Sequence, residues 1–242
     1  MDVSQQRLVV IDLDTRTVQR SWAINGAVDD QTAVLAVRPN GFQVILLGHG
    51  AAYDTSGRSL GATGIVGSLS ASGDGLHIYA QDRGISPASV TAFDLDYSAM
   101  SGGILMVSQV ASGQNINGSS NGGDIAVNYD NTNIYTATSA PYQCTMASTG
   151  LTAIRGLEGQ DVYPNNAETH LNGLIACGGA NQYGAADFWI YGSNGDLRSS
   201  HKVAGYARGL LPRQLVFSAD GRVVITLTDD PLMAFVPTGV LW

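Results

Sequence analysis

The feature that most constrains the fold is a hairpin signal that recurs along the whole chain. Apolar, β-prone runs are interrupted by a two-residue turn of Asn-Gly, Asp-Gly or Asp-Asn. These residues tolerate positive φ, and such a turn between two β-rich runs is the strongest local signal for a β-hairpin. Four segments carry it, namely 33–50 with Asn40-Gly41, 67–83 with Asp74-Gly75, 124–139 with Asp130-Asn131, and 214–230 with Asp220-Gly221. A fifth copy with a longer turn covers 161–179.

A second pair of apolar runs around a short polar turn accompanies these hairpins. Six such pairs cover 7–24, 51–62, 90–110, 142–154, 187–203 and 232–242. The hairpin turns, anchored at Gly41, Gly75, Asn131, Gly173 and Gly221, are separated by 34, 56, 42 and 48 residues, with a mean of 45. Four strands that repeat with a period of about 40–50 residues predict a β-propeller, in which neighbouring sheets cover each other's faces. The alternative all-β fold, a sandwich, has turn signals every 8–12 residues or so but no longer period.

Composition supports an all-β chain rich in tight turns. Gly contributes 30 of 242 residues, which is about 12% against a usual share of roughly 7%. Charged residues make up only 13%, and the chain contains just two Glu (Glu158 and Glu168) and one Lys (Lys202). Glu and Lys are the usual surface residues of helices, whereas Asp and Gly are turn residues. This bias disfavours a helical protein.

The repeats resemble those of the YVTN/YncE-like family, a branch of the WD40-like propellers. The resemblance is carried by Ser72-Gly73-Asp74-Gly75 before LHIYAQD, by 217–221 (FSADG) before VVITLTDD, and by 10–15 (VIDLDT). The Pro of the family's S-P-D-G turn is missing from both of these turn copies. The resemblance implies a propeller of four-stranded blades over most of the chain. It implies little about function, because this fold hosts enzymes, receptors and scaffolds.

We expect one propeller domain over residues 1–242, with about five blades and an extra or incomplete one. Five hairpins but six second pairs are present, and the chain opens on a second pair. In the favoured arrangement, 7–24 completes the blade begun by 213–230, and 232–242 is a surplus strand pair. Six blades with one incomplete, and a piece of a longer chain, are the alternatives.

Charge and hydropathy exclude two classes of partner. The net charge is −8 with no basic patch, so we expect no nucleic-acid binding. No apolar run approaches the roughly 18 residues of a membrane-spanning helix, so we expect no membrane insertion. Low Lys and Glu contents with many Asn, Gly, Ser and Thr favour a secreted, periplasmic or cell-surface bacterial protein. A cytoplasmic location stays open.

No motif selects catalytic residues or a metal site. Asp12 with Asp14, and Asp94 with Asp96, stand at strand ends before turns, where Asp side chains bind local backbone groups. The histidines at 49, 77, 170 and 201 lack metal-ligand spacing and are expected to be structural. Nothing in the sequence chooses an acid–base pair from Glu158, Glu168 and the 18 Asp. We therefore expect no cofactor, no metal and no identifiable catalytic residue.

Three further features are interpreted structurally. Cys144 and Cys177 fall in adjacent units, so either a disulfide or two small buried side chains fits them. Trp22, Trp189 and Trp242 all lie in second pairs, which predicts packing between blades. The Gly-, Ser- and Asn-rich stretch 111–123 is expected to be the longest surface loop.

The favoured function is a non-catalytic binding or scaffold module of a larger protein that recognises a protein or a glycan. The predicted contacts are the loops that ring one mouth of the propeller. Candidate binding residues are Asp29, Asp30, Asp82, Arg83, Asn181, Gln182, Tyr183, Arg208, Asp229 and Asp230. One alternative is a propeller enzyme, a lactonase or a glycan-cleaving enzyme, with a carboxylate pair or a metal in the central channel. Another is a self-associating subunit of a surface layer or filament.

Overall fold

Strands are almost the only regular secondary structure in the described part of the chain. The computed structural model describes residues 6–12, 14–24, 33–38, 41–82, 87–114, 116, 122–138, 144–159, 163–180, 184–205, 209–230 and 232–239. Within these residues lie 21 strands and one 3-10 helix, η1 (Met100–Gly102). The all-β expectation is therefore confirmed.

The strands form six separate antiparallel sheets. Four sheets have four strands each. The first contains β3 (Ala33–Val37), β4 (Gln43–Leu47), β5 (His49–Asp54) and β6 (Ser59–Val66), and the second contains β7 (Ser68–Ala71), β8 (His77–Gln81), β9 (Ser89–Asp96) and β10 (Met106–Gln114). The third contains β11 (Gly122–Val127), β12 (Asn133–Thr138), β13 (Cys144–Ser148) and β14 (Ala153–Gly156). The fourth contains β15 (Pro164–Thr169), β16 (Ile175–Gly179), β17 (Phe188–Tyr191) and β18 (Leu197–His201). A three-stranded sheet contains β19 (Leu210–Phe217), β20 (Val223–Thr228) and β21 (Met233–Pro237), and β1 (Arg7–Asp12) pairs with β2 (Thr17–Ala23).

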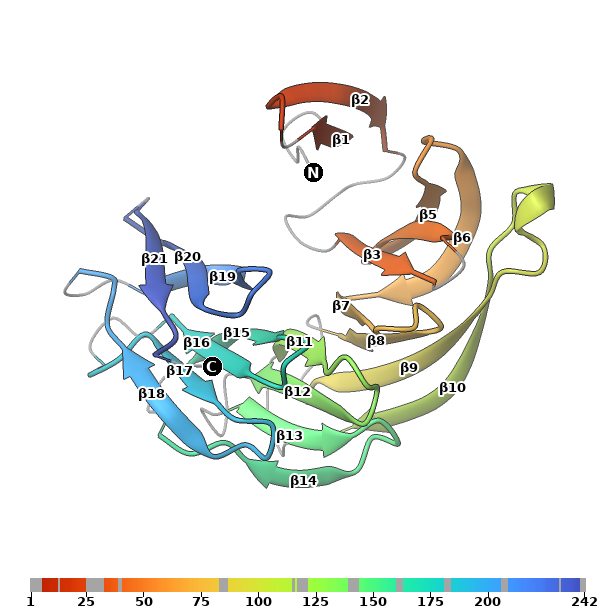
Figure 1. Cartoon of the computed structure of the whole chain (residues 1–242). Helices are drawn as coiled ribbons and strands as arrows, with labels where there is room; N and C mark the ends of the chain where they lie inside the picture. Colours follow the sequence, from red (N-terminus) through yellow and green to blue (C-terminus); the bar gives the residue numbers. More distant parts are fainter. Residues whose placement is uncertain are drawn as a thin grey trace.

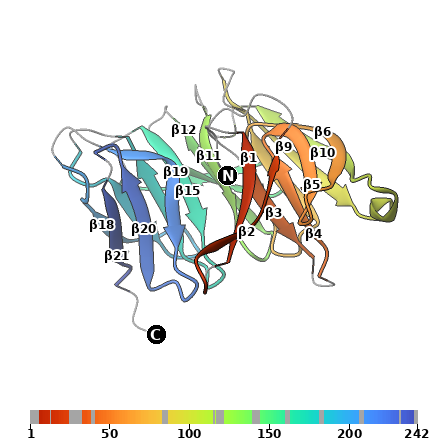
Figure 2. The same ribbon diagram turned by 90° about the horizontal axis from the view of Figure 1, so that it is seen from above.

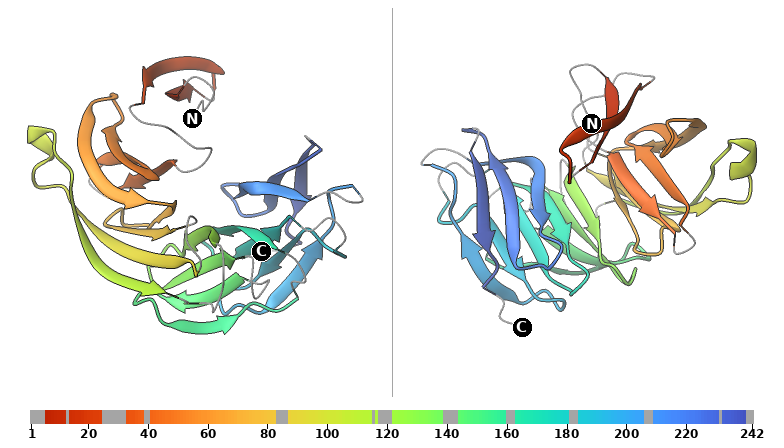
Figure 3. Two further views of the ribbon diagram at one scale, coloured as in Figure 1. Left: turned by 180° about the vertical axis from the view of Figure 1, so that it is seen from behind. Right: turned by 45° about the horizontal axis from the view of Figure 1, so that its top comes forward.

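The sheets follow one another around a common centre, in chain order. Figure 1 shows β3, β7, β11, β15 and β19 nearest this centre, with the later strands of each sheet stacked outward. The β1–β2 pair and the β19–β21 sheet stand at the two ends of the arc, and the view from behind in Figure 3 shows the same order. Figure 2 shows the sheets side by side with their strands upright.

The five predicted hairpin turns occur where the sequence places them. Gly41, Gly75, Gly173 and Gly221 have φ between +66° and +88°, and Asn131 has a φ of +55°. Each of these turns joins the first and second strands of one sheet. The turn residues therefore perform the role that their tolerance of positive φ predicted.

The predicted assignment of the two terminal segments is wrong. Residues 7–24 do not complete the sheet begun by 213–230, because in the described chain β1 pairs only with β2. Residues 232–242 are not surplus, because β21 pairs with β20 along its whole length. The described sheets are thus four of four strands, one of three and one of two, rather than five complete four-stranded sheets. Stretch 111–123 is also shorter as a loop than expected, because 111–114 extends β10 and 122–123 begins β11.

The hydrophobic core lies between neighbouring sheets. Trp189 on β17 is buried together with Tyr135, Cys144 and Met146 of the preceding sheet. Trp22 on β2 packs against Gly57 of the next sheet, where a Cβ atom on the glycine would lie 2.8 Å from the indole. Both tryptophans therefore pack between sheets as predicted, and Trp242 lies outside the described residues.

Side chains of the innermost strands also join neighbouring sheets by hydrogen bonds. Ser70 on β7 accepts from the Val127 N–H on β11 at 3.0 Å, and Thr169 on β15 donates to the Val127 carbonyl at 2.7 Å. Asn166 on β15 accepts from the Gln214 N–H on β19 at 2.7 Å. These innermost strands are sheet edges, whose backbone groups need partners. Polar side chains from the adjacent sheet provide them.

Candidate functional site

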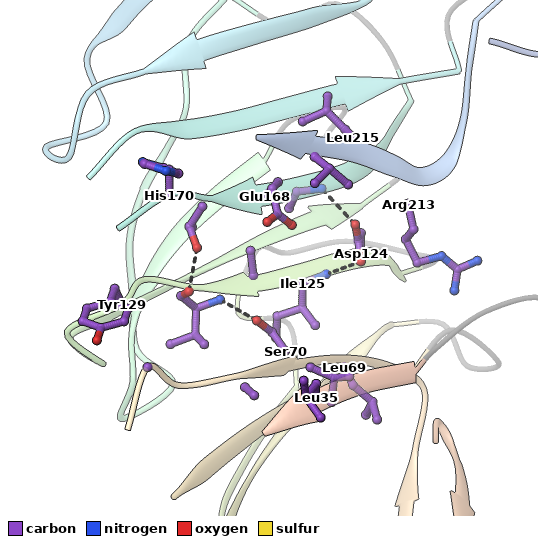
Figure 4. Close-up of a pocket in the computed structure, with 18 of the residues that line it drawn as sticks. Leu35, Leu69, Ser70, Asp124, Ile125, Tyr129, Glu168, His170, Arg213 and Leu215 are labelled. Atoms are coloured by element: carbon purple, nitrogen blue, oxygen red, sulfur yellow. Dashed lines mark hydrogen bonds between the residues drawn. The ribbon is translucent and has the colours of Figure 1, made fainter. Parts of the chain in front are cut away.

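The innermost strands enclose a central cavity. Its volume is about 400 Å³, and β3, β7, β11, β15 and β19 all contribute to its walls. Its lining combines aliphatic side chains, including Leu69, Ile125 and Leu215, with polar groups, and polar atoms make up the larger part of the exposed lining surface (Figure 4). The volume falls within the range of small-molecule sites, which usually have about 300–1,000 Å³.

The polar group of main interest in the cavity wall is the carboxyl group of Glu168 on β15. Asn166 and Glu168 alternate along β15, so their side chains lie on the same side of the strand, and His170 follows directly after its end. Asn166 bonds to the Gln214 N–H and the Leu211 carbonyl, and His170 lies 3.1 Å from the Ala219 carbonyl. Glu168 lies between these two residues in the chain, and its side chain lines the cavity (Figure 4). No hydrogen bond joins its carboxyl group to any residue that the structure describes.

The environment of Glu168 favours its neutral form. The side chain keeps some accessible surface because it faces the cavity, yet the surrounding protein desolvates its carboxyl group. Burial, with a smaller contribution from the charge of Asp124, raises the pKa of Glu168 from 4.5 to about 8. A desolvated carboxyl group beside a like charge is expected to hold its proton. Strongly shifted carboxyl groups in cavities are typical of functional sites.

Asp124 on β11 is the second carboxyl group in the cavity wall, but backbone groups hold it. Its Oδ1 accepts from the Ile125 N–H at 3.0 Å, and its Oδ2 accepts from the Ala167 N–H at 3.1 Å (Figure 4). The residue is 8% exposed. Asp124 therefore joins β11 to β15 and places a negative charge beside Glu168.

The turns that follow β7, β11 and β15 form one end of the cavity, which we call the turn end. Gly73, Tyr129, His170 and Leu171 contribute to it. The His170 Nε2 atom lies 3.1 Å from the Ala219 carbonyl, and Nδ1 accepts from the Asn172 N–H at 3.3 Å. Tyr129 is 63% exposed at this end. The cavity thus reaches solvent beside an aromatic side chain.

A strained residue on β19 forms another part of the wall. Pairing of β19 with β20 shifts register between Leu210 and Leu215, which marks a bulge. Arg213 within this bulge has a φ of +56°, which is uncommon for a residue other than glycine. Figure 4 shows its guanidinium group extending away from Glu168 and Asp124. Bulges and strained backbone gather at functional sites, so this feature agrees with a site in the cavity.

The predicted binding loops lie at the other end of the sheets, so far as the structure describes them. Asp82 follows β8, and Asp229 and Asp230 follow β20, and both strands run antiparallel to their inner neighbours. The Asp229 carboxylate accepts from the Gly209 N–H at 3.3 Å, and Asp230 accepts from the Thr228 hydroxyl group. The remaining predicted residues, Asp29, Asp30, Arg83, Asn181, Gln182, Tyr183 and Arg208, lie outside the described residues.

Other titratable side chains have the structural roles that the sequence suggested. The Asp12 carboxylate accepts from the Thr15 N–H at 2.8 Å, and such bonds lower its pKa. Asp96 binds the Ser98 N–H in the same way, with the same effect on its pKa. His77 is half-buried and lies 2.7 Å from a carboxylate oxygen of Asp94.

The two cysteines are free thiols. Cys144 and Cys177 are both completely buried, and they belong to the same core cluster. The structure therefore decides between the two interpretations of this pair, in favour of small buried side chains.

From the sequence, Glu168 was one of the carboxyl groups considered, but it was not among the candidate binding residues. Its position on an innermost strand, between side chains that bond to the next sheet, depends on how β15 packs against β19. The rarity of Glu in the chain is the one signal that could have drawn attention to it. The fifth hairpin was also the least clear of the repeats, so the strand face of Glu168 could not be assigned.

Comparison with known proteins does not assign the chain to a family. No protein-family model matches the chain, and no curated protein matches it either. In the described residues, no three His, Cys, Asp or Glu side chains are close enough to hold a metal ion together. No helix among those residues is long and apolar enough to cross a membrane. The resemblance to YVTN/YncE-like repeats therefore stays a prediction.

Proposed function

We propose that the chain is a β-propeller of the YVTN/YncE-like kind and works as a non-catalytic binding module. The sheets would be its blades, and the central cavity its channel. Support comes from the repeated four-stranded sheets set around one centre and from the repeat motifs in the sequence. A rigid ring of this kind presents a fixed cavity and fixed turns to a ligand.

The observation that carries the proposal is the unbonded carboxyl group of Glu168 in the wall of the central cavity. A ligand that carries a hydrogen-bond donor can bond to this carboxyl group. This moves the proposed site from the loops around Asp82 and Asp229 to the central cavity, with entry at the turn end beside Tyr129.

The geometry favours binding over catalysis. A glycan-cleaving enzyme needs two carboxyl groups that both face the substrate, one as acid and one as base or nucleophile. Both oxygens of Asp124 accept backbone hydrogen bonds, so this carboxylate has a structural task. Among the described residues that line the cavity, Glu168 then has no second carboxyl group beside it that is available to act on a substrate.

A ligand screen by NMR tests the proposal. Backbone amide signals of isotope-labelled protein would be followed during addition of a fragment library and of common mono- and disaccharides. We expect ligands that shift the amide signals of Ile125, Val127 and Thr169 and leave those of the outer strands β14 and β18 unchanged. A wild-type response that a Leu69→Trp substitution removes, by filling the cavity, would support the site, provided that the variant's other amide signals match the wild type.

Two outcomes would overturn the proposal. Shifts confined to the loops around Asp82 and Asp229, lost after charge reversal at Asp82 and Arg83, would place the site where the sequence analysis expected it. Turnover of chromogenic glycosides or lactones that is lost in Glu168→Gln would show an enzyme instead.

A further inference from the structure

We propose that β21 is an open sheet edge to which a second copy of this chain adds its own β21 in antiparallel orientation. The two copies would then share one continuous sheet. This contact goes beyond the proposed function, because it lies at the outer edge of the β19–β21 sheet and not in the central cavity. The strand order, the direction of the backbone groups and the composition of β21 all support it.

β21 is the third strand of its sheet, and in the described part of the chain no fourth strand pairs with it. The four complete sheets each continue from the third strand to a fourth, namely β6, β10, β14 and β18. The third strands β13 and β17 are accordingly buried along nearly their whole length, whereas every residue of β21 is at least partly exposed. Met233 and Phe235 are 53% and 63% exposed. β21 is therefore the edge of its sheet.

The backbone groups of Met233 and Phe235 point toward this edge. Just before β21, the Leu232 carbonyl accepts from the N–H of the last residue of β20 at 3.0 Å. Just after β21, the Thr238 N–H donates to the carbonyl of the residue before β20 at 2.8 Å. In an antiparallel ladder every second residue bonds to the neighbouring strand, so the even-numbered residues of β21 bond to β20. The N–H and C=O groups of Met233 and Phe235 face the other way, where the described chain offers them no strand.

β21 lacks the polar side chains that protect an exposed edge. Its sequence is Met-Ala-Phe-Val-Pro, whereas the outermost strands of the other sheets (β2, β6, β10, β14 and β18) all contain polar or charged residues. Natural sheet edges are protected from pairing by charged side chains, by Pro or by bulges. Pro237 removes one donor at the end of β21, but it leaves the groups of Met233 and Phe235 able to pair. An uncharged apolar edge of this kind favours the addition of another strand.

A second copy fits this edge because an antiparallel strand is complementary to itself. When two β21 strands pair around Ala234, Met233 of each copy lies opposite Phe235 of the other. The outward N–H groups of these residues then all have carbonyl acceptors, and each Met side chain lies beside a Phe ring, which is a favourable contact. β21 carries no charge that would repel its copy, although the chain has a net charge of −8. The pairing is two-fold symmetric, so it is complete once two copies have met.

Analytical ultracentrifugation tests for the dimer. A contact through one strand edge is small, and such interfaces are usually weak, so the protein is measured from about 10 μM to about 1 mM. We expect a monomer–dimer equilibrium. Phe235→Lys places a protecting charge on the edge and should raise the dissociation constant by at least about tenfold. Ile154→Lys on the outer strand β14 is the control, because Ile154 is 53% exposed as well, and it should leave the dissociation constant unchanged.

Amide hydrogen exchange, followed by NMR on the wild-type protein, shows whether the contact is at the β21 edge. The amides of Met233 and Phe235 should exchange quickly at low concentration, and at least about tenfold more slowly where most of the protein is dimeric. The amides of Ala234 and Val236, which bond to β20, should be protected at both concentrations. Matching amide spectra of Phe235→Lys and Ile154→Lys outside the substituted sites would show that both variants are folded.

Several results would overturn the inference. These are a monomer at every concentration, a dimer that Phe235→Lys does not weaken, and equal weakening by Ile154→Lys. Protection of Met233 and Phe235 that does not change with concentration would mean that a segment of the same chain covers the edge. Species that grow beyond the dimer would mean head-to-tail assembly instead. None of these results concerns the central cavity, so the proposed function is tested separately by the ligand screen.

Discussion

Lys202 donates a hydrogen bond to Asp187 at 2.6 Å, and this pair neutralises a completely buried carboxylate. The second oxygen of Asp187 accepts from the backbone N–H groups of Val203 and Ala204 at 2.6 and 2.8 Å. Lys202 is the only lysine in the chain. A buried charge is tolerated only when it is paired and hydrogen-bonded, so the chain uses its single lysine where a charge is fully enclosed.

Replacing Asp187 by Ala should lower the free energy of unfolding by about 3 kcal/mol, because it leaves two backbone donors and one lysine without their acceptor. Urea denaturation followed by tryptophan fluorescence measures the change. Arg222→Ala provides the control, since Arg222 and Asp220 form an exposed pair at 4.0 Å. Its removal should change stability by less than about 0.5 kcal/mol. Equal effects of both substitutions would contradict the role given to Asp187.

Stability should fall as pH rises if Glu168 is neutral in the folded protein. Its folded pKa of about 8 lies above its ordinary value of 4.5, so between these values the folded state binds more protons than the unfolded state. Below pH 4.5, Glu168 makes its full contribution to the free energy of unfolding. That contribution decreases as the pH rises and is lost as the pH approaches 8.

Glu168→Gln should remove this loss, because glutamine has no proton to release. Urea denaturation at pH 5, 7 and 9 would show the variant gaining on the wild type as pH rises, by about 1 kcal/mol or more at pH 9. Glu158→Gln is the matched control and should follow the wild type. A constant difference between Glu168→Gln and the wild type at all three pH values would mean that Glu168 is charged throughout.

Two hairpin glycines differ in how much space surrounds them. Gly41 and Gly75 have φ of +85° and +66°. A Cβ atom at Gly41 would meet nothing within 4 Å, whereas one at Gly75 would lie 2.5 Å from the Val37 carbonyl group of the neighbouring sheet. Gly41→Ala should therefore cost about 1 kcal/mol from backbone strain alone, and Gly75→Ala clearly more. Denaturation midpoints measured side by side decide this, and a larger loss at Gly41 would contradict it.

The two thiols should react only after unfolding. Cys144 and Cys177 are completely buried, and Cys144 Sγ lies 3.8 Å from the Asn166 carbonyl. A thiol must be accessible as the thiolate to react. In Ellman's assay we expect no fast reaction in buffer and two reacting thiols in guanidinium chloride. Fewer than two under unfolding conditions, without reductant, would indicate a disulfide.

Local chemistry explains why much of the fold could be predicted. Asp-Gly and Asn-Gly turns act within a few residues, so Gly75 and Gly221 mark hairpins whatever surrounds them. The caps at Asp12 and Asp96 are equally local. The pairing of the terminal segments was predicted wrongly because a strand such as β21 can pair with more than one neighbour, and its own residues do not specify which.

The site could be predicted only in part for the same reason. Glu168 was one of two glutamates in the sequence, but nothing beside it in the chain distinguishes it from Glu158. Glu168 differs from Glu158 in its tertiary surroundings, because it lines a cavity together with Asp124, 44 positions earlier, and with residues of β19, later in the chain. The loop residues chosen instead were polar and close to strand ends, which is a property of many surface positions.

By itself the sequence determined an all-β chain of repeated hairpins, because turn conformation and strand propensity depend on neighbouring residues. Only the tertiary structure decided which strands share a sheet and which strand of each sheet lies innermost. It also decided that a carboxyl group without a partner faces a central cavity. These depend on contacts between segments far apart in the chain, and such contacts bury Glu168 and bring it near the charge of Asp124, which together raise its pKa.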